Sequence, residues 1–142
     1  MENAYIKLVS NSNVQHISLD DVRDHFSYYK EITGKTGKQL DWDYDHAAFP
    51  YQIKEVNQEK NWFYLKSNHQ KYNAIVVGVG HEEMKDENGE TTEHSYIQVT
   101  LPQSSTAGDK GKANEFCKFL AKKLEGELHL FNGRIMYFYK RK

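Results

Sequence analysis

The sequence predicts an α+β fold, in which hairpins build an antiparallel sheet and two amphipathic helices pack on one of its faces. Apolar residues recur at the 3.6-residue spacing of a helix in two segments, near 19–29 and 112–124. The Asn-Gly pairs at 88–89 and 132–133 supply the positive φ angles that two-residue hairpin turns need. Strands joined by hairpins pair antiparallel, so the predicted order ββ-α-ββββ-α-ββ gives an antiparallel sheet. Its second face is expected to stay partly open.

The N-terminal part is expected to form a short hairpin and the first helix. Residues 4–9 and 14–17 have the character of strands around a polar turn. Ser18 is the predicted N-cap, because two aspartates follow it in the first turn and suit the positive end of a helix. The helix is predicted to end at Gly34 and Gly37.

The middle of the chain predicts four strands. Residues 51–56 and 62–66 form two of them, joined by a polar turn. Residues 73–84 include a run that is apolar on both faces of a strand, which is typical of a central position. Gly78 and Gly80 point to the same face, so we expect a helix to approach the sheet closely there. The partner strand follows the first Asn-Gly turn.

The C-terminal part predicts a helix and a last hairpin. Residues 112–124 form the second helix, after a loop rich in serine and glycine. The last hairpin turns at the second Asn-Gly pair. A two-residue turn there places Ile135 and Tyr137 on the core face, opposite Leu130 and Leu128.

Length and charge bound the class of protein. The 142 residues are expected to form a single globular domain, 1–142. A net charge of −1 provides no global attraction to nucleic acid or anionic lipid. One cysteine excludes a disulfide framework within the chain, and no segment approaches the ~18 apolar residues that span a bilayer. We therefore expect a cytoplasmic protein without membrane contact, and leave its oligomeric state open.

Residues 42–51 carry the strongest functional signal. They combine four aromatic residues with two aspartates, a histidine and a proline. Aromatic area is costly to leave in water, so these rings lie against either the core of the domain or a partner. The sequence leaves both interpretations open. We expect an aromatic-lined groove for an unknown protein or a small apolar ligand. Its predicted lining is Trp42, Tyr44, Phe49, Tyr51, Trp62 and Tyr64.

Two family resemblances accompany this signal. The stretch Trp-Asp-Tyr-Asp-His-Ala-Ala-Phe-Pro-Tyr-Gln-Ile at 42–53 resembles the aromatic signature of YugN-like proteins, although Pro50 replaces an expected acidic residue. Over the whole chain, the sequence is more similar to an uncharacterised bacterial domain-of-unknown-function family. That resemblance rests on residues 4–9, 112–116 and 128–134. It implies a shared small cytosolic fold and lends no catalytic residue.

The most enzyme-like pattern lies in the long central hairpin. A two-residue turn at 88–89 pairs Glu83 with His94 and gathers His81, Glu83 and His94 on one face. Two histidines and a carboxylate form a ligand set for zinc or iron. A shift of one residue in the register scatters this set, so the metal site depends on the inferred turn.

The C-terminal third also carries weaker signals for anion and nucleic-acid binding. Residues 108–112 precede the predicted helix and offer backbone N–H groups to an anion, although the spacing is not that of a P-loop. Lysines along that helix, with tyrosines beside the basic end of the chain, are a combination that binds single strands. The net charge of −1 opposes this interpretation, so nucleic acid is an unfavoured partner.

The favoured function is a non-enzymatic binding or regulatory module that uses an aromatic-lined surface and no cofactor. The abundance of aromatic residues supports it, because aromatic side chains are enriched at recognition surfaces. The alternatives are a small enzyme, either proline isomerase-like or a metal-dependent hydrolase, or a weak binder of single-stranded nucleic acid.

Overall fold

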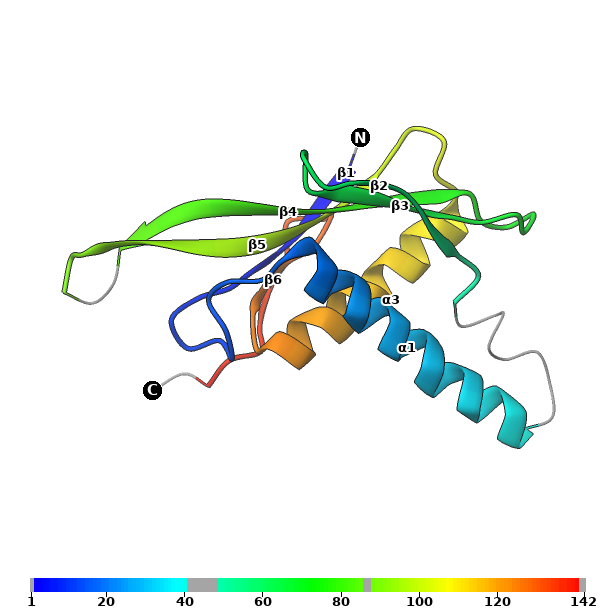
Figure 1. Cartoon of the computed structure of the whole chain (residues 1–142), viewed down its shortest axis with the longest axis horizontal. Coiled ribbons are helices and arrows are strands. Elements are labelled where there is room, and N and C mark those ends of the chain that lie inside the picture. The colour runs from blue at the N-terminus through cyan, green and yellow to red at the C-terminus, as the bar shows by residue number, and fades with distance from the viewer. Residues whose placement is uncertain (1, 41–48, 86–87, 141–142) are drawn as a thin grey trace.

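The computed structural model describes residues 2–40, 49–85 and 88–140, which form a seven-stranded sheet and two helices (Figure 1). The α+β class predicted from the sequence is therefore confirmed. The strands are β1 (Glu2–Lys7), β2 (Gln52–Asn57), β3 (Trp62–Lys66), β4 (Ala74–Lys85), β5 (Thr91–Leu101), β6 (Glu127–His129) and β7 (Ile135–Tyr137). The helices are α1 (Leu19–Leu40) and α3 (Ala107–Leu124).

The strands follow the order β2-β3-β4-β5-β1-β6-β7, and every neighbouring pair is antiparallel. Consecutive strands are hairpin neighbours except at β1, which lies between β5 and β6. Ile6 of β1 is opposite Ile97 on one side and Leu128 on the other. The first strand of the chain thus joins the middle hairpins to the last one.

Both helices lie on one face of the sheet, below it in Figure 1, as predicted. α3 packs against β1, β4, β5 and β6 through a buried apolar face. α1 crosses α3, and its C-terminal end points away from the sheet in the same view. In the part of the chain that the structure describes, no helix is long and apolar enough to cross a membrane.

Aromatic rings fill the space between the helices and the sheet. Phe26 of α1 meets Phe63 of β3 and Phe116 of α3 edge to face, with ring centroids 6.1 and 5.5 Å apart. Phe49 joins them, 5.4 Å from Phe116. Such pairs contribute about 0.5–1.5 kcal/mol each beyond the burial of their area. Part of the aromatic signal in the sequence therefore belongs to the core.

Reciprocal capping bonds start both helices. Ser18 Oγ accepts the N–H of Asp21 at 3.0 Å and the Asp21 carboxylate accepts the N–H of Ser18 at 3.1 Å, so the predicted cap is confirmed. α3 starts five residues before the predicted position, because Thr106 and Asp109 form a second capping box. The Thr-x-x-Asp spacing was the signal for this start, in a segment whose glycines favoured a loop.

Two predictions for the N-terminal part are wrong. Residues 14–17 form no strand; Ser95 instead donates its N–H to the carbonyl of Gln15 and accepts the N–H of Ile17 on its hydroxyl. α1 continues through Gly34 and Gly37 instead of ending there. An isolated glycine costs a helix only about 1 kcal/mol, which the rest of the helix can offset.

The predicted register of the last hairpin is wrong by one residue. His129 is opposite Ile135, and Leu128 is opposite Met136. Leu130 donates its N–H to the carbonyl of Arg134, so the loop has three residues and ends at Gly133 with a φ of 86°. The shift turns Ile135 and Tyr137 away from the core, where they are 41 and 42% exposed.

Candidate functional site

The sheet face opposite the helices, here called the open face, carries the aromatic residues that the core does not take. On β3, Trp62 and Tyr64 alternate with the buried Phe63 and Leu65. On β5, Tyr96 alternates with core residues in the same way. Side chains two apart on a strand share a face, so these rings lie together on the open face.

A groove of about 260 Å³ runs across the open face between β3 and β5. Trp62 and Tyr64 form one wall, edge to face with ring centroids 5.3 Å apart. Tyr96 forms the other wall and packs edge to face on Tyr5 of β1 at 5.9 Å. The groove therefore has aromatic rings on two sides.

The floor of the groove is the backbone of β4 at Gly78 and Gly80. A Cβ on Gly80 would lie 2.4 Å from Cζ of Tyr96, so the tyrosine ring lies directly on the strand. A Cβ on Gly78 would lie 3.2 Å from the Asn61 carbonyl oxygen and 3.5 Å from Trp62 Cβ. The prediction that a helix packs on these glycines is wrong, because they face the aromatic rings of the open face.

Polar side chains close one end of the groove. The Thr100 hydroxyl donates to Asn3 Oδ1 at 2.6 Å, and Gln98 Nε2 donates to the same oxygen at 3.2 Å. Gln98 and Thr100 both line the groove. A ligand with an apolar body thus meets hydroxyl and amide groups at this end, which is the usual composition of a small-molecule site.

A second cavity of about 440 Å³ adjoins the first at Tyr64 and is mainly polar. Lys54 and Lys66 line it, together with the carboxylate of Glu55. Lys66 Nζ lies 2.7 Å from Glu55 Oε1 and 5.0 Å from the centroid of the Tyr64 ring. The Lys66 ammonium group therefore lies both against the Tyr64 ring and beside the Glu55 carboxylate.

The structure divides the six predicted groove residues among three places. Trp42 and Tyr44 lie outside the described residues. Phe49 and Tyr51 are core residues, 6 and 3% exposed, on the helix side of the sheet. Trp62 and Tyr64 line the groove of the open face. Tyr5 and Tyr96 were not among the predicted residues; the signal for Tyr96 was the pattern Tyr96-x-Gln98-x-Thr100, which alternates with Ile97, Val99 and Leu101.

Tyr51 belongs to a buried polar network centred on Asp109, which is fully buried. The Tyr51 hydroxyl donates to Asp109 Oδ1 at 2.5 Å. The backbone N–H groups of Asn73, Ala74 and Thr106 donate to the same carboxylate at 3.0–3.1 Å. Burial, and then the bond to Asp109, raises the pKa of Tyr51 above its ordinary value, so the hydroxyl stays protonated. This network connects the start of α3 to the sheet.

The predicted metal ligands His81, Glu83 and His94 do not converge. His94 is opposite Glu82, and Glu83 is opposite Glu93, one residue away from the predicted register. His94 therefore projects to the other face of the sheet from His81 and Glu83. Its ring nitrogens bond to the Leu8 carbonyl at 2.9 Å and to the Thr92 hydroxyl at 3.1 Å. No group of three metal-binding side chains is present in residues 2–40, 49–85 and 88–140.

A serine, a histidine and a glutamate meet in the same hairpin without forming a catalytic relay. Ser95 Oγ and Glu93 Oε1 both approach Nδ1 of His81, at 3.2 and 3.6 Å. A relay needs the carboxylate on one ring nitrogen and the nucleophile on the other. Ser95 is 1% exposed and its hydroxyl accepts the N–H of Ile17, so this side chain fixes the backbone before α1.

The predicted anion-binding loop at 108–112 lies inside α3, and its first residue is tightly packed. A Cβ on Gly108 would lie 2.5 Å from the Lys71 carbonyl oxygen, so the helix start packs tightly on that segment. Cys117 of the same helix is fully buried, and burial raises the pKa of its thiol to about 12. The thiol therefore stays protonated and is not a nucleophile.

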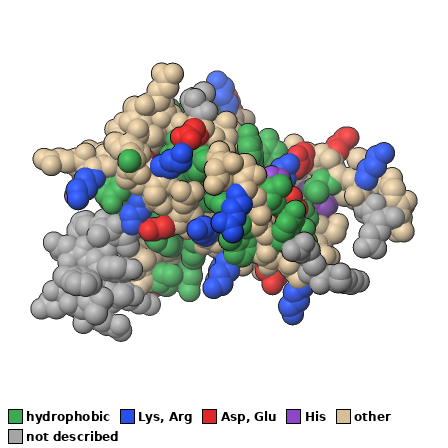
Figure 2. Space-filling model, turned by 180° about the vertical axis from the view of Figure 1, so that it is seen from behind, with side chains coloured by type: hydrophobic (Ala, Val, Ile, Leu, Met, Phe, Trp, Pro, Cys, Tyr) green, Lys and Arg blue, Asp and Glu red, His purple; other side chains and the backbone are tan. Residues whose placement is uncertain are grey.

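On the face shown in Figure 2, the basic side chains of the described residues do not gather into one patch. Figure 2 shows lysines and arginines scattered among polar and hydrophobic side chains on the face in view. Lys110 pairs with Glu2 at 2.9 Å and Lys112 with Glu115 at 3.3 Å, while Lys123 lies over the ring of Tyr28. These lysines lie on α3, across the sheet from the open face.

The comparisons with known proteins concern the whole chain. The family described as "Domain of unknown function (DUF1885)" matches residues 2–140. A crystal structure of a protein of unknown function from Bacillus stearothermophilus is 40% identical, with a TM-score of 0.54, over 86% of this chain and 89% of that one. No curated protein matches the sequence. The resemblance to an uncharacterised family is thus confirmed, and the chain belongs to the family Domain of unknown function (DUF1885).

Proposed function

We propose that the protein is a non-enzymatic, cytoplasmic binding module that holds a small ligand with a flat apolar body in the groove of the open face. The observation that carries this proposal is the groove itself: about 260 Å³, floored by Gly78 and Gly80 and walled by Trp62 and Tyr96. A flat floor between aromatic walls accepts a planar group and buries it on both of its faces.

The chemistry of the lining supports binding over catalysis. The groove is lined by aromatic and apolar side chains with a few amides and hydroxyls. The described residues that line it include Lys60 but no carboxylate, imidazole or thiol. Contacts of this kind orient a ligand without an acid–base pair, and general acid–base catalysis needs groups that exchange protons near neutral pH.

The contrast with the core rings also supports a recognition role. Phe26, Phe63 and Phe116 are at most 1% exposed, whereas Trp62, Tyr64 and Tyr96 stay partly exposed on a face that neither described helix covers. Keeping large rings in contact with water costs roughly 25 cal/mol per Å² of apolar surface. A ligand that covers them recovers this free energy.

Titration of the ¹⁵N-labelled protein with indole, a neutral planar probe, tests the proposal by NMR. We expect saturable shifts of the Gly78 and Gly80 amide signals, and their loss in Trp62→Ala. Tyr28→Ala is the matched control, since Tyr28 is a 45% exposed ring on α1. Shifts that do not saturate, or that survive Trp62→Ala unchanged, would overturn the proposal.

A further inference from the structure

We propose that the groove and the adjoining polar cavity form one composite site for a small molecule that joins a planar aromatic ring to an anionic group. This inference rests on the function proposed above and specifies the ligand class. The two cavities share Tyr64, so a ring stacked beside Trp62 can extend its substituent past Tyr64 into the polar cavity.

The lysines that line the two cavities favour a negatively charged substituent. Lys60 lines the groove, and Lys54 and Lys66 line the polar cavity. Glu55 is the carboxylate of that cavity, and it is engaged by Lys66 at 2.7 Å. Among the described residues, Lys54 and Lys60 have no ion-pair partner, so each cavity offers an ammonium group to an anion.

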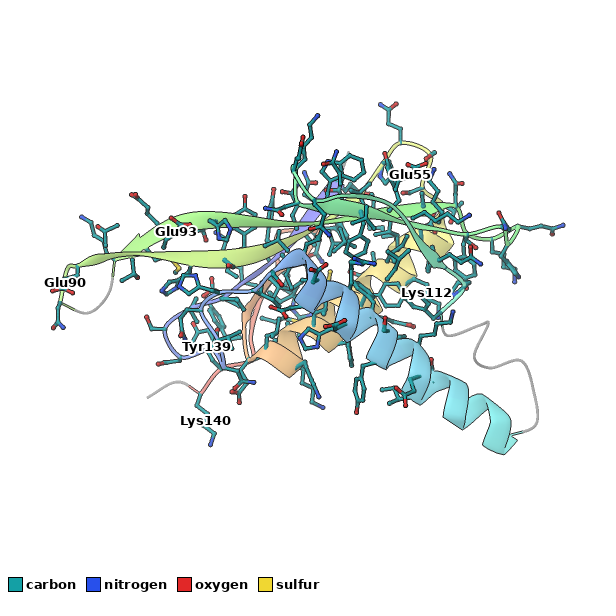
Figure 3. All side chains as sticks on the ribbon, in the orientation of Figure 1. Glu55, Glu90, Glu93, Lys112, Tyr139 and Lys140 are labelled. Atoms are coloured by element: carbon teal, nitrogen blue, oxygen red, sulfur yellow. The ribbon has the colours of Figure 1, made fainter. Side chains whose placement is uncertain are left out.

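The acidic residues near the tip of the β4–β5 hairpin lie away from both cavities. Figure 3 shows Glu90 and Glu93 near the far tip of the β4–β5 hairpin, well away from Glu55 and the strands β2 and β3. The end of the sheet that carries the two cavities therefore has more lysines than carboxylates facing its cavities. An anionic group is favoured at this end by Coulomb attraction, although solvent and salt weaken it.

Two residues that line the cavities, Glu55 and Asn61, also have an unusual backbone conformation. Besides Glu125, which caps α3, the described residues other than glycine with positive φ are Glu55 at 54° and Asn61 at 56°. Glu55 lines the polar cavity and lies where the register of β2 shifts against β3, while Asn61 lines the groove. Such backbone costs on the order of 1–3 kcal/mol and concentrates at ligand sites, where bulges aim side chains. The bulge sets Glu55 beside Lys66 and leaves Lys54 unpaired.

The polar cavity also has neutral groups suited to an oxyanion. Ser67, Asn68 and Asn73 line it, and Asn73 Nδ2 is anchored on the Ser104 carbonyl at 3.0 Å. Hydroxyl and amide donors beside a lysine are the usual partners of phosphate or carboxylate oxygens. Adenosine 5′-monophosphate, which joins a planar heterocycle to a phosphate, is therefore a suitable probe of the class.

The test uses Trp42→Phe, which leaves Trp62 as the single tryptophan and its fluorescence as the readout. We expect adenosine 5′-monophosphate to quench Trp62 saturably and to bind roughly three- to fivefold tighter than adenosine, the contribution of an exposed ion pair. Added salt should remove this difference in affinity without changing the affinity for adenosine. Lys54→Gln should reduce it in the same way, and Lys118→Gln, an exposed lysine of α3, should not.

The controls separate the two proposals. Equal affinity for the nucleotide and the nucleoside, or an advantage unchanged in Lys54→Gln, would overturn the anionic part while the groove stands. Binding of indole without binding of either adenosine compound also overturns this inference and leaves the proposed function intact. Absence of binding by all three probes would overturn both. A short oligodeoxyadenylate that binds much tighter than the mononucleotide would replace the small molecule with a nucleic-acid strand.

Discussion

Replacing Asp109 with asparagine should lower the free energy of unfolding by about 2–4 kcal/mol, because this carboxylate is the shared acceptor of a buried network. Oδ1 accepts the Tyr51 hydroxyl, and Oδ2 accepts the N–H groups of Ala74 and Thr106. Asparagine keeps one oxygen and replaces the other by a donor. Its least costly orientation turns the amide NH₂ toward the Tyr51 hydroxyl, which can also accept.

The magnitude follows from the bonds that remain. A hydrogen bond to a charged acceptor contributes about 1.5–3 kcal/mol and one to a neutral acceptor about 0.5–1.5 kcal/mol, so each retained backbone bond weakens by about 1 kcal/mol. Relief from burying a charge offsets part of this loss. Tyr51→Phe removes one donor and leaves the carboxylate otherwise satisfied, so we expect a smaller cost of about 1 kcal/mol.

Urea unfolding followed by circular dichroism measures these differences, provided that the slope of the transition is unchanged. Asp24→Asn is the matched control, since Asp24 is an exposed aspartate on α1 and should shift stability by less than about 0.5 kcal/mol. A midpoint for Asp109→Asn equal to that of the unmodified protein would refute the assignment of Asp109 as the organising acceptor.

Three further predictions follow from other parts of the structure. Gly80→Val should cost about 1–3 kcal/mol, because the new side chain displaces the ring of Tyr96; an unchanged urea midpoint would contradict that contact. Ile135→Asp should change stability by less than about 1 kcal/mol in the same assay, since Ile135 is 41% exposed. Complete unfolding of this variant would instead support the register in which Ile135 faces the core. Burial raises the pKa of Cys117 to about 12, so its contribution to stability is full below the unfolded value near 9 and falls as pH rises from there toward 12. Cys117→Ala should flatten that part of the pH–stability curve, and an identical slope in both proteins would argue against the buried thiol.

The predicted groove residues that the structure describes divide between the core and the open face, and the division has a physical cause. Trp62 and Tyr64 line the groove of the open face, whereas Phe49 and Tyr51 belong to the core. Aromatic composition measures how much ring area must be covered and does not identify what covers it. The helices cover one face of the sheet, so the side on which a ring falls decides between packing and recognition.

The hairpin errors have a different cause. Asn-Gly correctly marked the last turn, yet a three-residue loop ending at Gly133 replaced the expected two-residue turn. The two-residue turn and the three-residue loop both use a glycine with positive φ, so the local sequence does not distinguish between them. The difference of one residue exchanged the faces of Ile135 and Met136 and, in the central hairpin, separated His94 from His81.

The sequence by itself determined the α+β class, the two helices, the Ser18 cap and most strands, because hydrophobic periodicity and capping are local properties. Only the tertiary structure decided that β1 lies between β5 and β6, that Asp109 is buried, and that Gly78 and Gly80 face aromatic rings instead of a helix. These outcomes depend on strand pairing between distant segments. Their free energy comes from contacts between segments that are distant in the sequence, and short-range patterns do not encode which distant partner each strand will meet.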